Sequence, residues 1–347
     1  RVQGRVNREE RQRIIRKLNK RAAWERVDRN TKKYRHPILR RCMKYAATIV
    51  LPLFMVGVGF YLIRDKEEIH PVAEMVKISP GVTKAELVLA DGHKVVLGTE
   101  TIDSLVSEEG VNIVKDGNGV SYLGNKEEGD LAYNIMRVPR GGEFKVRLQD
   151  GTLVYMNSET ELKYPVRFVG KERRVYLKGE AYFEVTHHES QPFIVKAGTT
   201  RIEVLGTQFN VRAGNGAPCI TTLIKGCVKV RNKANDTVVI HPGQQVNAPV
   251  EGAMSVRAVD CRFYTAWKRD RFAFQDVPLY RLMDELSQWY GCTFEFSRPE
   301  LANLHFTTIV PRYDNISEVL AVLQATHEFE FLEMGHHILI TDYGHEN

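Results

Sequence analysis

The stretch KVRLQDGTLVYMN, residues 145–157, decides how the central part of the chain folds. Apolar and polar residues alternate on both sides of Asp150-Gly151, a pattern typical of two strands that each bury one face. An Asp-Gly step between such segments favours a two-residue turn, because both central residues of that turn need positive φ. We therefore predict a β-hairpin at these residues.

The stretch ELVLADGHKVVLG, residues 86–98, repeats the pattern around Asp91-Gly92. We expect the two hairpins to occupy equivalent places in two β subunits, or in successive rungs of one. Between residues 72 and 250, glycine-containing turns separate many short strand-like segments, and few helical patterns occur. This organisation predicts a mainly β protein whose central unit is a sandwich or a solenoid-like array.

The pattern changes after Trp267. Apolar residues recur at helical spacing between Pro278 and Gly291, and again between Ile316 and Leu323. Strand-like segments flank both helices, so we predict a small α+β domain with the order β-α-β-β-α-β-β over residues 268–342. Its edge strands are expected to accept a strand from a partner. The candidate partner-binding residues are Phe272, Phe274, Phe294, Phe296, His305 and Thr307.

Residues 45–63 carry no charged side chain. As a helix that rises about 1.5 Å per residue they would reach roughly 28 Å, close to the ~30 Å hydrocarbon core of a bilayer. We therefore predict a single transmembrane helix. The alternatives are a buried core helix and a cleaved signal peptide, and the second is disfavoured because the segment follows 44 other residues.

Residues 1–44 contain 17 Lys and Arg but only four acidic residues, a net charge of +13, so the rest of the +6 chain carries −7. This asymmetry predicts a cytoplasmic N-terminus and a larger C-terminal part across the membrane. Basic residues beside anionic lipid explain the segment more simply than nucleic-acid binding, so no nucleic-acid partner is expected. Because the chain begins at Arg1, we expect part of the cytoplasmic region to precede it. The expected order is a basic segment (1–44), a transmembrane helix (45–63), a β region (64–135), an all-β domain (136–250) and the α+β domain (268–342).

Five cysteines are too few for a disulfide scaffold. In one continuous strand Cys219 and Cys227 would lie roughly 26 Å apart, so a bond between them needs a chain reversal. We expect lone thiols instead.

The sequence lacks the common motifs for nucleotide binding, zinc proteolysis and serine hydrolysis. His187-His188 and His336-His337 are adjacent, and neighbours in a strand point to opposite faces, so neither pair forms a metal site by itself. Glu180 and Glu184 would share a strand face, where two acids are usually solvated or hydrogen-bonded. We therefore expect neither an enzyme acting on an external substrate nor a cofactor or metal.

One dipeptide raises a chemical question. Gly206-Thr207, within VLGTQFNV (204–211), can place a hydroxyl against the preceding carbonyl. Attack by that hydroxyl would give an ester and then a cut chain. A Gly-Thr turn is more often only a turn.

Several segments together resemble the FecR domain over roughly residues 137–247, among them VPRGGEFKVRLQDGTLVYMNSETELKYPVRF, RRVYLKGEAYFEV and PFIVKAGTTRIEVLGTQFNV. The stretch from WKRDRFAFQDVPLYRLMDELSQWYGCTFEF to HFTTIVPRYDNISEVL resembles the C-terminal domain of Bacteroidetes members. That domain is similar to the signalling domain of secretins and TonB-dependent receptors. The resemblance covers over half of the chain, in order.

The resemblance implies a single-pass inner-membrane regulator of an extracytoplasmic-function (ECF) sigma factor, with an anti-sigma role. Its cytoplasmic end would hold the sigma factor, and its periplasmic end would receive a signal from a TonB-dependent outer-membrane transducer. The helices with which relatives hold the sigma factor are not recognisable in residues 1–44. Some FecR-like regulators are cut at the Gly-Thr of this motif, so the resemblance also implies self-cleavage at Gly206-Thr207.

A second hypothesis is a membrane-anchored periplasmic protein that binds a ligand such as a glycan. It requires exposed aromatic side chains on one β face, for which Tyr155, Tyr164, Tyr176 and Tyr182 are the candidates.

Overall fold

The computed structural model describes residues 78–98, 106–108, 111–116, 119–123, 132–214, 216–326 and 329–342. These residues belong to one compact unit. The predicted basic segment and transmembrane helix, residues 1–63, lie outside the described residues. Among the helices within the described ranges, none combines the length and the apolar character needed to cross a bilayer.

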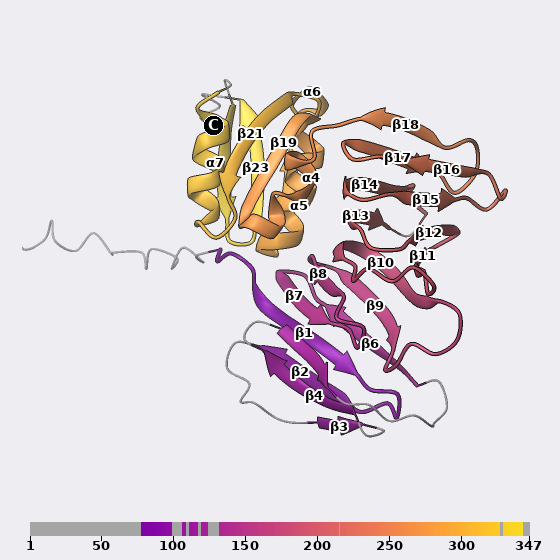
Figure 1. Ribbon diagram of the computed structural model, residues 1–347. Helices are drawn as coiled ribbons and strands as arrows, with labels where there is room; N and C mark the ends of the chain where they lie inside the picture. The colour runs from indigo at the N-terminus through magenta and orange to yellow at the C-terminus, as the bar shows by residue number, and fades with distance from the viewer. Residues whose placement is uncertain are drawn as a thin grey trace, which may run out of the picture. The chain divides into compact units, whose positions relative to one another are not determined.

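Strands dominate the first part of the described chain, and they form two facing sheets (Figure 1). Nearly all pairs in the first sheet are antiparallel, and each strand is short because a turn follows it within a few residues. In sheet order its strands are β2 (Lys94–Gly98), β1 (Val82–Val88), β6 (Tyr133–Val138), β9 (Thr160–Pro165), the first half of β10 (Arg173–Glu184), β11 (Phe193–Ala197), β12 (Thr200–Val204), β15 (Val228–Arg231) and β16 (Thr237–Ile240).

The second sheet lies opposite, and its strands alternate along the chain with those of the first. Successive hairpins therefore add to the two sheets in turn, which gives a sandwich with solenoid-like rungs. Its strands are β3 (Val106–Glu108), β4 (Val111–Asp116), β5 (Gly119–Leu123), β7 (Gly142–Arg147), β8 (Leu153–Met156), the second half of β10, β13 (Gln208–Ala213), β14 (Cys219–Lys225), β17 (Gln244–Ala248) and β18 (Ser255–Ala258).

Strand β10 belongs to both sheets. Residues up to Lys178 pair with β9 and β11, whereas residues from Gly179 onward pair with β8 and β13. The change occurs at Gly179, whose φ of +103° is reached easily only by glycine. A Cβ there would also lie 2.5 Å from Thr160 Oγ1, so the close approach of β9 excludes a side chain.

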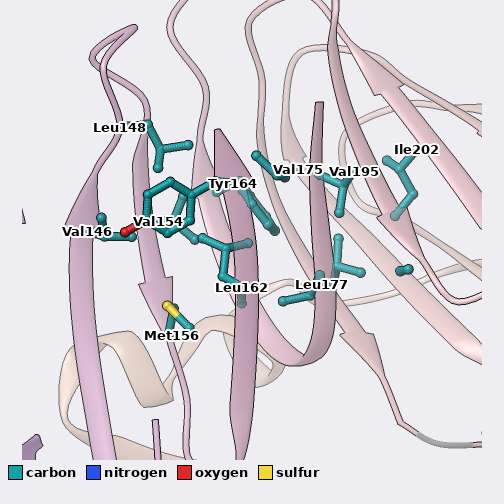
Figure 2. Packing of buried hydrophobic residues seen from close by; sticks show 14 of the residues in the cluster. Val146, Leu148, Val154, Met156, Leu162, Tyr164, Val175, Leu177, Val195 and Ile202 are labelled. Atoms are coloured by element: carbon teal, nitrogen blue, oxygen red, sulfur yellow. The ribbon is translucent and has the colours of Figure 1, made fainter. Parts of the chain in front are cut away.

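The core between the two sheets consists of the inward-pointing residues of each strand. Figure 2 shows side chains of β7 to β12, such as Val146, Met156 and Leu162, gathered between the strands. Val146, Met156 and Leu162 are fully buried, as are Val175 and Ile202. Removing one such side chain costs about 2–5 kcal/mol when it is truncated to alanine. The alternation read from the sequence thus produces the buried layer, and the mainly β fold is confirmed.

Both predicted hairpins form, but their turns differ from the prediction. The Leu89 N–H donates to His93 O and the Leu148 N–H donates to Thr152 O, so each loop contains three residues rather than two. Only the glycine of each Asp-Gly step has positive φ, +89° at Gly92 and +84° at Gly151.

The aspartates instead cap the turns. Asp91 Oδ1 accepts the His93 N–H and Asp150 Oδ1 accepts the Thr152 N–H, which stabilises the loop without positive φ at the aspartate. The first strands of the two hairpins also meet, because Val82 pairs in parallel with Gly142. The two repeats are therefore neighbouring units of one sandwich.

The C-terminal domain has two small sheets and the predicted β-α-β-β-α-β-β order, with one additional short helix, α6 (Figure 1). One sheet pairs β19 (Arg271–Pro278) with β21 (His305–Pro311), and the other has the order β20 (Thr293–Phe296), β23 (His337–Asp342), β22 (Phe329–Met334). The helical elements are α4 (Arg262–Thr265), the 3₁₀ turn η1 (Trp267–Arg269), α5 (Leu279–Tyr290), α6 (Pro299–Ala302) and α7 (Ile316–Gln324).

Helix α5 begins and ends where its sequence predicts. Pro278 precedes it in an extended conformation, and Gly291 ends it in the left-handed region with a φ of +67°. Leu282, Leu286 and Trp289 on its buried face pack into a second core, which also contains the buried face of α7.

Replacement of Gly179 by alanine tests the strand crossing. We expect Gly179→Ala to lower the free energy of unfolding of the β sandwich by about 2–4 kcal/mol, because it combines backbone strain with a clash against β9. The control is Gly198→Ala, where φ is +59° and no atom lies within 4 Å of the added Cβ; it should cost about 1 kcal/mol. Urea denaturation followed by circular dichroism measures both, and equal costs would refute the role of the crossing.

Candidate functional site

The C-terminal domain docks onto the β sandwich through a small set of polar and aromatic contacts, which we call the domain junction. The sandwich contributes residues from the β6–β7 turn and from the outer face of β8, β10 and β13. The C-terminal domain contributes η1, the C-terminal half of α5 and the residues that follow β21. These elements are far apart in the sequence, so the junction depends on long-range contacts.

Arg312 lies at the centre of the junction and is only 1% exposed. Its guanidinium carbon is 3.8 Å from the centroid of the Trp289 ring, which favours the cation through a cation–π interaction. Its Nη2 donates to Asn157 Oδ1 of the sandwich at 2.6 Å, and Glu143 Oε2 lies 3.8 Å away. Burial lowers the pKa of the guanidinium, and the Glu143 carboxylate opposes that shift.

The backbone around Arg312 is fixed by its own domain. Its carbonyl oxygen accepts the Trp289 indole N–H at 2.7 Å, and its N–H donates to Asp270 O at 2.9 Å. The next residue, Tyr313, packs edge-on against Trp289 and donates its hydroxyl to Glu143 Oε1 at 2.8 Å. The C-terminal domain thus holds the backbone of Arg312, and its side chain reaches the sandwich.

The turn between β6 and β7 covers the C-terminal end of α5. The Gly141 N–H donates to Gln288 O, and Arg140 donates to the carbonyl oxygens of Ser287 and Cys292. A helix C-terminus favours a cation, so the position of Arg140 stabilises the end of α5. Gly81 also contacts Trp289, since a Cβ at this position would lie 2.6 Å from the indole ring.

Lys268 makes a third contact. Its ammonium lies 4.4 Å from the Tyr155 ring centroid and 4.2 Å from that of Tyr182, and it bonds to Glu184. Tyr155 and Tyr182 are directly opposite each other on β8 and β10. Burial raises the pKa of Tyr182 to about 12.

The four tyrosines considered for glycan binding do not form one exposed face. Tyr155 and Tyr182 enclose Lys268, Tyr164 is 1% exposed, and Tyr176 is exposed on a different part of the sandwich where it packs against Tyr133. The requirement of the ligand-binding hypothesis, a row of accessible rings, is not met by these residues.

The acidic residues of β10 are structural partners. Glu180 accepts the side-chain amides of Asn157 and Asn210, at 3.0 and 2.8 Å. Glu184 pairs with Lys268, and Arg212 on β13 pairs with Glu285 on α5 at 2.8 Å. Each carboxylate therefore balances a donor at the junction.

Most of the predicted partner-binding residues point into the hydrophobic core of the C-terminal domain, to which they belong. Phe272 and Phe274 are each 4% exposed, and Phe294 and Phe296 are half-buried against the same core. His305 is exposed and lies 2.7 Å from Asp276 Oδ1, and Thr307 Oγ1 accepts the Asp276 N–H. Of the six residues, His305 and Thr307 are therefore the two that are exposed.

The sheet of β20, β23 and β22 presents a different surface. Leu332 and Met334 are 42% and 55% exposed, and they pair with Leu339 and His337 on β23. The sequence contains the signal for this face, because Phe329 and Phe331 point inward and alternation sends Leu332 and Met334 outward. We call Leu332, Met334, His337 and Leu339 the outer face of this sheet.

Gly206-Thr207 occupies a tight turn between β12 and β13. Thr207 is 3% exposed, and its hydroxyl donates to Cys227 O at 3.1 Å. A Cβ on Gly206 would lie 2.6 Å from His187 Nδ1, and one on Gly226 would lie 2.9 Å from Thr207 Oγ1. The Gly-Thr peptide is therefore enclosed by neighbours that leave no room for a side chain.

The four cysteines of the described residues are free thiols. Cys219 is buried and Cys227 is exposed, although both lie close to the ends of β14. Burial raises the pKa of Cys219 and of Cys292 to about 11, which keeps both protonated at neutral pH.

Truncation of Arg312 tests the junction. We expect Arg312→Ala to lower the free energy of unfolding by about 3–5 kcal/mol, because it opens space among the aromatic rings and leaves Asn157 and Glu143 without their cation. Arg298→Ala, which removes an exposed ion pair with Asp342, is the matched control and should cost at most about 1 kcal/mol. Urea titration followed by tryptophan fluorescence measures both, and a loss for Arg312→Ala no larger than the control contradicts the central role of Arg312.

Comparison with known families gives two adjacent matches. Residues 134–229 match the family described as FecR protein, and residues 271–340 match the family described as FecR, C-terminal. No curated protein matches the chain.

Two crystal structures of a candidate anti-sigma factor from Parabacteroides distasonis ATCC 8503 share the fold. One has a TM-score of 0.55 and 24% sequence identity, and the match covers 60% of this chain and 99% of that chain. The other has the same TM-score and identity, and the match covers 61% and 100%. The chain therefore carries a FecR domain followed by a FecR C-terminal domain.

Proposed function

We propose that this chain is a transmembrane anti-sigma regulator. In this proposal residues 45–63 cross the inner membrane, residues 1–44 lie in the cytoplasm beside an ECF sigma factor, and both folded domains lie in the periplasm. The observation that carries the proposal is the order of the two FecR-family domains after a strongly basic segment and an uncharged 19-residue stretch. The fold shared with proteins described as candidate anti-sigma factors supports it.

We assign the receipt of the signal to the C-terminal domain. Its partner is the signalling domain of a TonB-dependent outer-membrane receptor, and it binds on the outer face of the β20–β23–β22 sheet. Leu332 and Met334 are exposed apolar side chains on β22, which lies at the edge of this sheet in the described part of the chain, so the strand offers apolar contacts and an edge for strand addition. The opposite face of the same strands carries the buried residues Ile338 and Ile340 and is unavailable.

A charge on the outer face should abolish this interaction. We expect Met334→Glu to weaken binding of the purified receptor signalling domain at least tenfold, because apolar anchors near the centre of an interface dominate its affinity. Tyr280→Ala, at an exposed aromatic residue on α5, is the control and should change the affinity less than twofold. Calorimetric titration measures both. Wild-type protein that fails to bind the receptor domain, or Met334→Glu protein that binds normally, would refute the assignment.

We also propose that the chain cleaves itself between Gly206 and Thr207. The Thr207 hydroxyl attacks the Gly206 carbonyl carbon, the C–N bond breaks, and the Thr207 amine is released. Water then hydrolyses the ester, which leaves a carboxylate on Gly206 and restores the hydroxyl. The specific observation in favour is the enclosure of this peptide by His187 and Gly226, together with the burial of the Thr207 hydroxyl, which a hydrogen bond to Cys227 O holds in one position.

Substitution of Thr207 tests the cleavage. We expect wild-type protein isolated from cells to contain a fragment that begins at Thr207, identified by mass spectrometry. Thr207→Ala should yield one uncut chain because it lacks a nucleophile, whereas Thr207→Ser should restore the cut. Intact wild-type chains in cells, or cleavage in Thr207→Ala, would exclude this chemistry.

A further inference from the structure

A cavity of about 190 Å³ lies at the domain junction. One wall is formed by the second sheet of the sandwich, on the side that points away from the sandwich core, with the side chains of Glu180, Asn210 and Gln245. Aromatic residues of the C-terminal domain, among them Trp267 and Trp289, form the other wall. Both domains are therefore needed to form the cavity.

Buried polar atoms in this lining have no hydrogen-bond partner among the residues that the structure describes. They are the indole Nε1 of Trp267, Nε and Nη1 of Arg312, and Oδ1 of Asn210. The three residues are 9%, 1% and 3% exposed, respectively. Native proteins pair nearly all of their buried polar groups, so several unpaired ones around one cavity indicate a missing partner.

The unpaired atoms and the charges both favour an anion. Three of the four atoms are N–H donors, so they require an acceptor. Five arginines line the cavity but only two carboxylates, those of Glu180 and Glu285. Glu180 already accepts two amides, Glu285 is paired with Arg212, and Glu143 lies 3.8 Å from Arg312. The five arginines therefore still outnumber the carboxylates that face them.

The aromatic wall favours an organic molecule over a bare ion. The side chains of Phe263, Tyr264, Trp267, Phe272 and Trp289 line this side and offer apolar contact area. The cavity is smaller than the roughly 300–1,000 Å³ of sites for drug-sized ligands, so its ligand is smaller than those.

We propose that the domain junction binds a small organic carboxylate. The carboxylate lies toward Arg312, Trp267 and the cavity-lining Arg281, and the carbon frame packs on the aromatic wall. Because this ligand touches both domains, it stabilises their docked arrangement by an amount that grows with the logarithm of its concentration once that exceeds the dissociation constant. The site is separate from the outer face that we assign to the receptor, so each can be tested without the other.

Matched pairs of ligands test the proposal on the purified full-length chain. Benzoate is compared with benzamide, and glucuronate with glucose, by calorimetric titration and by thermal unfolding. We expect at least one carboxylate to bind ten times more tightly than its neutral partner and to raise the unfolding temperature. If neither carboxylate exceeds its neutral partner, or if inorganic phosphate binds and the organic carboxylates do not, the proposal is wrong.

Two variants locate the binding within the cavity. Trp267→Phe removes the unpaired indole N–H together with part of the ring but keeps an aromatic side chain, so it should weaken carboxylate binding about tenfold. Arg281→Gln removes an exposed lining charge without disturbing the core and should weaken binding at least threefold, whereas Arg298→Gln, outside the cavity, should leave it unchanged. Equal affinities for Arg281→Gln and Arg298→Gln would place the ligand elsewhere and overturn the assignment.

Discussion

A buried guanidinium needs partners, and Arg312 has all of its partners only while the two domains are docked in one arrangement. Its aromatic neighbours Trp289 and Phe272 come from its own domain, whereas Asn157 and Glu143 come from the sandwich. Moving such a cation out of water costs several kcal/mol that only these contacts offset. A small rotation or slide of the C-terminal domain would separate the cation from Asn157, so this one side chain fixes how the domains meet.

The other junction contacts are consistent with a docked arrangement that is specific yet separable. Arg140 caps the end of α5, Lys268 lies between two tyrosine rings, and Arg212 pairs with Glu285. Polar groups of this kind regain hydrogen bonds to water when two surfaces part, unlike a continuous apolar interface. In the regulator that we propose, this property lets a binding event on the C-terminal domain alter how that domain is held, without unfolding either core.

Local patterns in the sequence predict the elements well, because alternation and helix capping depend on neighbouring residues. Two features follow in this way: the hairpins around Asp91 and Asp150, and the limits of α5 between Pro278 and Gly291. The turn type does not follow, because an Asp-Gly step serves both a two-residue and a three-residue loop, and strand twist decides between them. The inward direction of Phe272 and Phe274 does not follow for a related reason: a strand pattern gives two faces but does not say which one the helices cover.

The domain junction is the part that sequence could not reveal. Arg312 and Asn157 are 155 residues apart, and each alone reads as an ordinary polar surface residue. The two residues become neighbours only when the sandwich and the C-terminal domain meet. No periodicity or motif in the sequence therefore indicates their contact. The same holds for the partners of Glu180: the sequence predicts a solvated or hydrogen-bonded acid, but it does not identify the amides of Asn157 and Asn210 as the donors. Unpaired donors on Arg312 and Trp267, by contrast, become visible only once every neighbour has been placed, and they then identify a cavity that neither domain forms by itself.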